Sequence, residues 1–166
     1  MIKKTLVVIM MLCFITITGC ANSKQDEING VPNAQVLYDA KNSHIGDNSS
    51  DLKLLDLLNA NYLGKFTIEL EASQEPYILK VIFTDINKDL DEEEFKNAIK
   101  NNSILLLALI ENADVIKCVY PIDGILKEET IKVEDTNKFL GEDIKEYGKS
   151  KDGIEKLINI LYDKNN

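Results

Sequence analysis

The stretch 89–110, DLDEEEFKNAIKNNSILLLALI, decides the fold of this chain. Its first six residues are mainly acidic, and acidic side chains stabilise the positive N-terminal end of a helix. Asp91, followed three residues later by Glu94, fits a helix-capping pattern. Residues 104–110 are apolar on every side, and a helix end without a polar face must be buried all round. We therefore predict a long helix over 89–110 whose C-terminal end is the centre of the core.

Runs of alternating apolar and polar residues flank this helix on both sides and predict two hairpins. Before the helix, residues 66–70 and 77–83 alternate with opposite phase. After it, residues 115–122 and 125–133 are joined by Asp123-Gly124, a two-residue turn signal. Apolar residues at helical spacing predict three further helices, at about 50–60, 136–147 and 150–162. The chain therefore predicts an α+β fold, in which an antiparallel four-stranded sheet (two hairpins) has helices packed on it.

The first twenty residues, MIKKTLVVIMMLCFITITGC, have the features of an export signal. Two lysines precede an apolar run from Thr5 to Thr18, which is shorter than the roughly 20 residues of a stable membrane span. Gly19-Cys20 places a cysteine where cleavage is expected. This arrangement resembles the bacterial lipoprotein signal, in which that cysteine is acylated and becomes the mature N-terminus. The alternative is an ordinary secretory signal in which the cysteine is coincidental.

The predicted signal and its cleavage site divide the chain into three parts. Residues 1–19 are predicted to be a lipoprotein signal peptide. Residues 20–34 are polar and contain Gly30 and Pro32, so we expect a flexible tether that is lipid-anchored at Cys20. Residues 35–166 are expected to form a single α+β domain. The protein would then reside on the extracytoplasmic face of the cell membrane.

The charge of the chain restricts its partners. The formal net charge is −9, and all 19 basic residues are lysines. Removing residues 1–19 removes Lys3 and Lys4, which leaves 17 − 28 = −11. An acidic surface repels phosphate groups, so we expect no nucleic-acid partner and no attraction to anionic lipid head groups. The membrane contact predicted here is the lipid anchor alone.

Signals for catalysis, cofactors and metals are weak, and we predict none of the three. Cys118 lies in an alternating apolar run, where a small buried residue is expected, and His44 is the only histidine that could activate it. Asp85 to Glu94 places oxygen ligands at alternate positions, as a calcium-binding loop does. However, Leu90 occupies the turn position that needs glycine, and Lys96 occupies the position of the final glutamate. Capping of a helix explains these acids better.

The segment 44–50, HIGDNSS, is the strongest candidate for a binding loop. Gly46 can supply a positive φ, Asp47 and Asn48 favour turns, and a helix follows directly. Such a loop can bind an anion through backbone N–H groups at the helix N-terminus, and we place Tyr77 beside it. The competing interpretation is that the loop only caps its own helix, because Asp47 and Asp51 already occupy the positive end.

Four blocks of the chain resemble the domain of unknown function 4825 family. In chain order they are VLYDAKNSHIGDNSSDLKLLDLL, EPYILKVIF, ILLLALIENADVIKCVY and FLGEDIKEYGKSKDGIEKLI. The resemblance covers about Val36 to Leu161, although His44 stands where an aromatic residue such as tyrosine is expected. It implies a firmicute lipoprotein, and similar domains occur as outward-facing segments of beta-lactam-sensor-type membrane metallopeptidases. It implies no established enzymatic activity and supplies no catalytic residues.

Together these observations favour a non-enzymatic binding or sensing domain on the cell surface. Its target would be an envelope ligand or a membrane-protein partner, and the ligand-binding candidates are Gly46, Asp47, Asn48 and Tyr77. Two alternatives stay open. One is an envelope hydrolase that uses a pair of carboxylates which the sequence does not single out. The other is a structural partner subunit that packs its sheet or its tyrosine-bearing helices on a membrane protein.

Overall fold

The structure is a computed structural model that describes residues 30–162. The predicted signal peptide, Cys20 and most of the predicted tether therefore lie outside the described residues. In chain order the elements are α2 (Ala34–Asp39), α3 (Asn48–Leu57), α4 (Ala60–Leu63), β1 (Phe66–Glu71), β2 (Ile78–Phe83), α5 (Glu92–Leu109), β3 (Val115–Ile122), β4 (Ile125–Lys132), α6 (Val133–Leu140), α7 (Ile144–Tyr147) and α8 (Lys151–Tyr162). None of these helices combines the length and apolar character that a membrane span requires.

The four strands form one sheet in the order β1-β2-β3-β4. Both predicted hairpins are confirmed, because β1 pairs antiparallel with β2 and β3 pairs antiparallel with β4. The prediction of a purely antiparallel sheet is wrong, since β2 and β3 run parallel. The physical reason is the connection between them. Helix α5 carries the chain from the end of β2 back to the start of β3, and this crossover makes the two strands point the same way.

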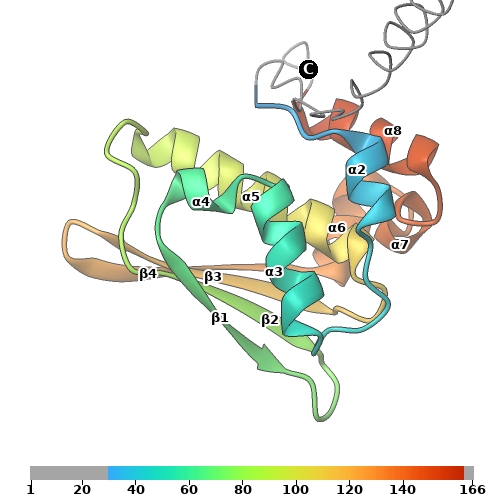
Figure 1. The fold of residues 1–166 in the computed structure, drawn as a ribbon, viewed down its shortest axis with the longest axis horizontal. Coiled ribbons are helices and arrows are strands. Elements are labelled where there is room, and N and C mark those ends of the chain that lie inside the picture. The colour runs from blue at the N-terminus through green and yellow to red at the C-terminus, as the bar shows by residue number, and fades with distance from the viewer. Residues whose placement is uncertain (1–29, 163–166) are drawn as a thin grey trace, which may run out of the picture.

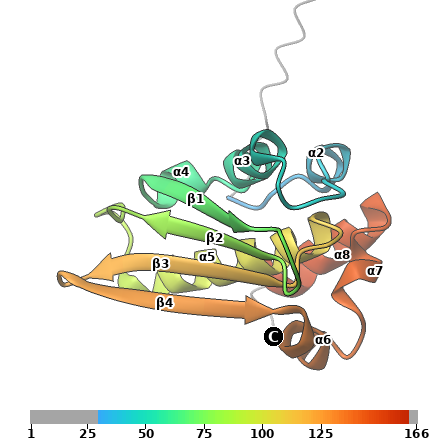
Figure 2. The same cartoon turned by 90° about the horizontal axis from the view of Figure 1, so that it is seen from below.

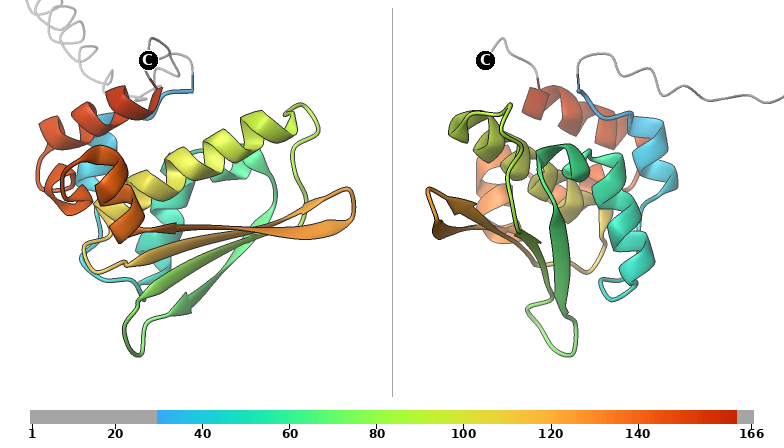
Figure 3. Two further views of the ribbon diagram at one scale, coloured as in Figure 1. Left: turned by 180° about the vertical axis from the view of Figure 1, so that it is seen from behind. Right: turned by 60° about the vertical axis from the view of Figure 1, so that its left-hand side comes forward.

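The molecule has two layers (Figures 1 and 2). Helix α5 lies across one face of the sheet, and α3, α4 and α8 are on the same side. The opposite face of the sheet carries no helix from the described part of the chain (Figure 3). This arrangement separates a helix-covered face, which belongs to the core, from an open face.

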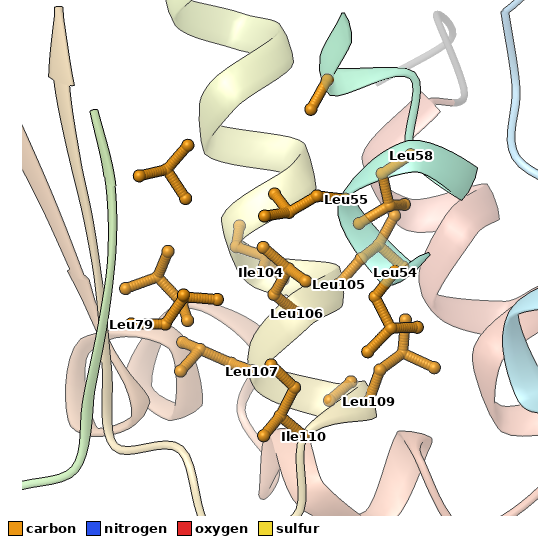
Figure 4. Close-up of a cluster of buried hydrophobic side chains, with 14 of the residues drawn as sticks. Leu54, Leu55, Leu58, Leu79, Ile104, Leu105, Leu106, Leu107, Leu109 and Ile110 are labelled. Carbon is orange, nitrogen blue, oxygen red and sulfur yellow. The ribbon is translucent and has the colours of Figure 1, made fainter. Parts of the chain in front are cut away.

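The C-terminal half of α5 is the centre of the core, as predicted. Every side chain from Ile104 to Ile110 is buried. Figure 4 shows why a helix can be apolar all round here: Leu79 of β2 lies on one side of α5, and Leu54 and Leu55 of α3 lie on the other. Each buried aliphatic side chain stabilises the fold by about 1.5–3 kcal/mol relative to an exposed one. This segment therefore joins the two layers.

The N-terminal end of α5 is closed by its own side chains. The Asp91 carboxylate accepts a hydrogen bond from the Glu94 backbone N–H at 2.8 Å. The Asp91 N–H in turn donates to the Glu94 carboxylate at 3.1 Å, which completes the capping box. The acidic run of residues 89–94 thus acts as the charged first turn of a helix. No group of three histidine, cysteine or acidic residues that could hold a metal ion occurs among residues 30–162.

The helices differ from the prediction in three places. The helix expected over 136–147 is broken at Gly141, whose φ of +74° ends α6 before α7 begins. The helix expected over 50–60 begins earlier, at Asn48, and ends before Asn59, whose φ is +55°. Helix α2 was not predicted. Its first residue, Ala34, is the last residue of the predicted tether, and the Asn33 side chain caps it.

The buried C-terminal end of α5 is closed by distant parts of the chain. A helix leaves its last four carbonyl groups without partners in the helix, and buried carbonyls need donors. Leu109 O accepts from the Asn42 N–H at 2.9 Å, and the Asn42 carbonyl accepts from the Glu111 N–H at 2.9 Å. Gly148 packs so closely on Ala108 that a side chain on it would collide with the Ala108 carbonyl oxygen. Segments from both ends of the domain therefore meet at this point.

Lys145 provides the third of these contacts. Its Nζ donates to the carbonyl oxygens of Leu107, Ile110 and Ala113, at 2.6, 2.9 and 2.7 Å. The three donors of the ammonium group are therefore all used, and its positive charge lies at the negative end of the α5 dipole. Burial lowers the pKa of Lys145 to about 8, and the nearby carboxylate of Asp114 opposes this shift. Because this pKa is still above 7, the group is mainly charged at neutral pH.

We expect the substitution Lys145→Met to reduce the free energy of unfolding by about 2–4 kcal/mol, because it leaves three carbonyl groups at the end of α5 without this donor. Chemical denaturation of both proteins would measure the difference. Lys149→Met is the matched control, since Lys149 is exposed and pairs only with Glu146 on the surface. Equal effects of the two substitutions would show that the Lys145 contacts do not hold α5.

Candidate functional site

The predicted binding loop is the N-terminal cap of α3. The Asp47 carboxylate accepts hydrogen bonds from the backbone N–H groups of Ser49 and Ser50, at 3.2 and 3.3 Å, and from the Ser50 hydroxyl at 2.8 Å. These bonds lower the pKa of Asp47, the Ser50 hydroxyl contributing most. Asn48 is the exposed first residue of the helix. The N–H groups that an anion would use are thus engaged by Asp47.

Asp51 holds the same loop through hydrogen bonds from the protein interior. Its side chain is fully buried, with Oδ1 accepting from Asn42 Nδ2 at 3.0 Å and Oδ2 facing the Gly46 N–H at 3.4 Å. Burial raises the pKa of Asp51. Gly46 has a φ of +118°, which favours glycine, and it lies against Ala72 of the β1–β2 turn. Asn42 therefore links this loop to the end of α5.

Tyr77 is positioned by different contacts from those of the loop. Its N–H donates to the Asp114 carboxylate at 2.7 Å, and its carbonyl accepts from the N–H groups of Asp114 and Val115. These bonds join the start of β2 to the start of β3. Binding of a ligand by Gly46, Asp47, Asn48 and Tyr77 stays a prediction, and their observed contacts are those of a helix cap and a strand junction.

Asp47 and Asp51 are neighbouring carboxylates whose pKa values are shifted in opposite directions. Such a pair can divide the roles of acid and base in an active site. Here the group with the raised pKa is fully buried and already bonded to Asn42. A general acid must reach its substrate within hydrogen-bond distance, so this geometry suits a structural role for Asp51.

Cys118 and His44 are far less suited to catalysis than to structure. Burial raises the pKa of the Cys118 thiol to about 11, and its Sγ lies 3.5 Å from the Ser103 hydroxyl. A thiol with this pKa is protonated at neutral pH and is a poor nucleophile. His44 is exposed in the loop before α3, and its backbone N–H donates to Asn42.

A cavity of about 120 Å³ lies beside the end of α5. The residues that line it include Lys41, Asn42, Glu111, Lys145 and Lys149. Its volume is below the roughly 300–1,000 Å³ of pockets that bind small molecules. Two of its polar side chains already have hydrogen-bond partners in the protein, because Lys145 donates to carbonyl groups at the end of α5 and Asn42 donates to Asp51. We therefore regard this cavity as part of the junction at the end of α5.

The open face of the sheet is the candidate that the fold leaves unexplained. Side chains alternate between the two faces of a strand, so the neighbours of the core residues Val81, Cys118 and Tyr120 point to the open face. On β2 and β3 the residues of the open face are Ile78, Lys80, Ile82, Val115, Lys117, Val119 and Pro121. Strand β4 adds Leu126, Glu128 and Thr130, which are paired with Pro121, Val119 and Lys117.

Four aliphatic residues of this face do not contact the main core and are partly or largely exposed. We call them the apolar patch, and they are Ile82, Val119, Pro121 and Leu126. Ile82 lies opposite Val119 in the parallel pair. Leu126 is 70% exposed, the highest value among the exposed large hydrophobic side chains of the described residues. An apolar group in this position offers area that a partner can bury.

Two lysines lie directly beside the apolar patch. Lys80 and Lys117 are opposite each other in the parallel pair, on the row next to Ile82 and Val119. Like charges in directly opposed positions destabilise a sheet. Glu69 of β1 compensates one of them, with its carboxylate 3.0 Å from Lys80 Nζ. No acidic oxygen of residues 30–162 lies within 4.0 Å of Lys117 Nζ.

The open face therefore combines an apolar patch with Lys117, a lysine that forms no ion pair within the described part of the chain, and Glu128 lies on the same face in the next row, opposite Val119. This face can bind a partner through side-chain contacts, without any covalent chemistry. Sequence reasoning missed it because the patch depends on the parallel pairing of β2 and β3, which places Ile82 beside Val119. The sequence did carry a signal for this face. Positions 78, 82, 115 and 119 are aliphatic although they alternate with the core residues, so both faces of the two strands are partly apolar.

Comparison with known proteins identifies one family. The model of a family described as Domain of unknown function (DUF4825) matches residues 37–134. The match begins in α2 and ends in α6, so it contains the whole sheet, α5 and the loop before α3. No curated protein and no solved structure matches the chain.

We predict that Asp51→Asn lowers the free energy of unfolding by about 1–3 kcal/mol, because a buried asparagine at this position has one acceptor oxygen for the two donors of Asn42 and Gly46. Thermal or chemical denaturation would measure the loss. The control is Asp56→Asn on the exposed side of the same helix, where one oxygen is enough to accept from Asn61 at 2.7 Å. A stability unchanged by Asp51→Asn would contradict the structural role and reopen a catalytic one for this carboxylate.

Proposed function

This chain belongs to the family described as Domain of unknown function (DUF4825), and we propose that it is a non-enzymatic binding domain held on the outside of a cell membrane by a lipid on Cys20. Its target is a protein of the cell envelope, and its binding surface is the open face of the sheet. The observation that carries the proposal is the apolar patch beside Lys117. The residues of this patch are not part of the hydrophobic core of the domain.

A partly apolar sheet face that is exposed to water lowers the stability of the domain. Exposed apolar area gains about 25 cal/mol per Å² when a partner removes it from water. A like-charged lysine pair lowers the stability of the sheet unless an acid offsets it. A face that carries both features is explained better by binding than by folding.

The sequence around Cys20 supports the membrane location. A single acyl chain binds a membrane only weakly, whereas two chains give stable anchoring. The arrangement Ile17-Thr18-Gly19-Cys20 resembles the signal at which a diacylglycerol is attached. A chain anchored in this way needs no basic patch to stay on the membrane, in keeping with its net charge of −9.

The fold also supports a partner in the space beyond the membrane. The described chain begins just before α2, which packs against α8 in the helix layer (Figures 1 and 3). The open face is on the other side of the molecule. Nine residues lie between Cys20 and Gly30, and the ten steps from one to the other span at most about 35 Å. An anchor on the helix side leaves the open face accessible to proteins.

Photocrosslinking in living cells tests this function. We expect a photoreactive amino acid at Leu126 to form an adduct with another envelope protein, because Leu126 is on the open face. The matched control is the same amino acid at Phe139, which is 62% exposed on α6 and lies near Lys100 of the helix layer. Cys20→Ala should move the protein to the soluble fraction and abolish the adduct. Adducts at both positions, or at neither, would contradict the proposal.

A further inference from the structure

We propose that the open face docks an amphipathic helix of the partner protein, which presents an aspartate or glutamate to Lys117 and aliphatic side chains to the apolar patch. This inference rests on the proposed function and names the class of partner. Three features of the face lead to it: its used backbone hydrogen bonds, the spacing of its rows and its charge.

Backbone hydrogen bonding favours a helix over an extended peptide. The open face is centred on β2 and β3, and both strands have a hydrogen-bonded neighbour on each side. Their main-chain groups are therefore occupied, and only side chains are offered to a partner. An extended segment lying on this face would find no partner for its own N–H and C=O groups, whereas a helix satisfies its own.

The row spacing of the face matches that of a helix lying along the strands. Rows on one face of a strand are two residues apart, which is about 6.6 Å. The row of Lys117 is thus about 6.6 Å from the row of Val119 and about 13 Å from the row of Pro121 and Leu126. On a helix, positions i+4 and i+8 are about 6 and 12 Å from position i and lie on the same face. An acid at i with aliphatic residues at i+4 and i+8 therefore fits.

Charge selects an acidic residue for position i. The chain as a whole has a net charge of −9 and repels acidic partners at long range. Within the row of Lys80 and Lys117, Glu69 pairs only with Lys80. Glu128 lies on the same face but in the next row, opposite Val119, and forms no ion pair with Lys117. A carboxylate of the partner beside Lys117 would give each of the two lysines of this row an acidic neighbour. This row would also reject partners with a lysine at the same position.

Two helical peptides provide the test. They are identical, with leucine at i+4 and i+8, except that one has glutamate and the other lysine at position i. The protein, purified from expressing cells, is titrated with each peptide, and the NMR signals of the Ile82, Val119 and Leu126 methyl groups are followed. We expect the glutamate peptide to shift these signals and to bind at least tenfold more tightly than its twin at low ionic strength.

Two variants of the protein make the result specific. Lys117→Glu should abolish or reverse the preference for the glutamate peptide. Lys127→Glu makes the same charge change on β4 but on the helix-covered side of the sheet, opposite Tyr120, and should keep it. Equal binding of both peptides, shifts outside the apolar patch, or no shift at millimolar peptide would overturn the inference.

Two further outcomes separate this inference from the proposed function. Methyl shifts that grow with protein concentration before any peptide is added would assign the face to a second copy of the chain and overturn the helical partner. A crosslink from Leu126 to an envelope protein, together with no preference between the peptides, would leave the binding function standing and overturn only the acidic helix.

Discussion

The fold depends on how the buried C-terminal end of α5 is satisfied. Ile104 to Ile110 are buried on all sides, so the last carbonyl groups of this helix cannot reach water. Asn42, from the N-terminal part of the domain, donates to Leu109 O, and Lys145, from the C-terminal part, donates to Leu107 O. An unpaired buried polar group costs about 1–3 kcal/mol, and a domain has only about 5–15 kcal/mol of net stability. Closing this helix end therefore ties three distant segments to one another.

The same constraint decides where a binding surface can be. Because α5 must be covered by both the sheet and α3, the helices gather on one face of the sheet. The loop before α3, which looks like a binding loop in the sequence, is used to attach that helix to α5 through Asn42 and Asp51. The face that α5 does not cover keeps the apolar patch and Lys117 at least partly exposed, whereas Ile78 and Val115 on the same face are buried. Under the proposed function, folding and binding thus use opposite faces of β2 and β3.

Local patterns were enough to predict the four strands and most of the helices but not α2 or the break at Gly141, and non-local contacts decided the rest. The α5 helix and its capping box, the two hairpins and the Asp123-Gly124 turn follow from neighbouring residues, and the structure contains all of them. The parallel pairing of β2 with β3 depends on the crossover through α5, which strand patterns do not reveal. Lys145 reads as an ordinary helical lysine because its three acceptors lie more than thirty residues away. The open face was missed for the same reason, since its patch is assembled across strands.

Native-state hydrogen exchange at the junction tests the central claim most directly. The Asn42 N–H donates to Leu109 O, and the Glu111 N–H donates to Asn42 O, so both amides are protected only while the end of α5 stays closed. If the fold depends on this junction, these two amides exchange only through global unfolding, with the same opening free energy as amides in the middle of α5. Opening at Asn42 and Glu111 with a clearly lower free energy, while the middle of α5 stays protected, would contradict the account.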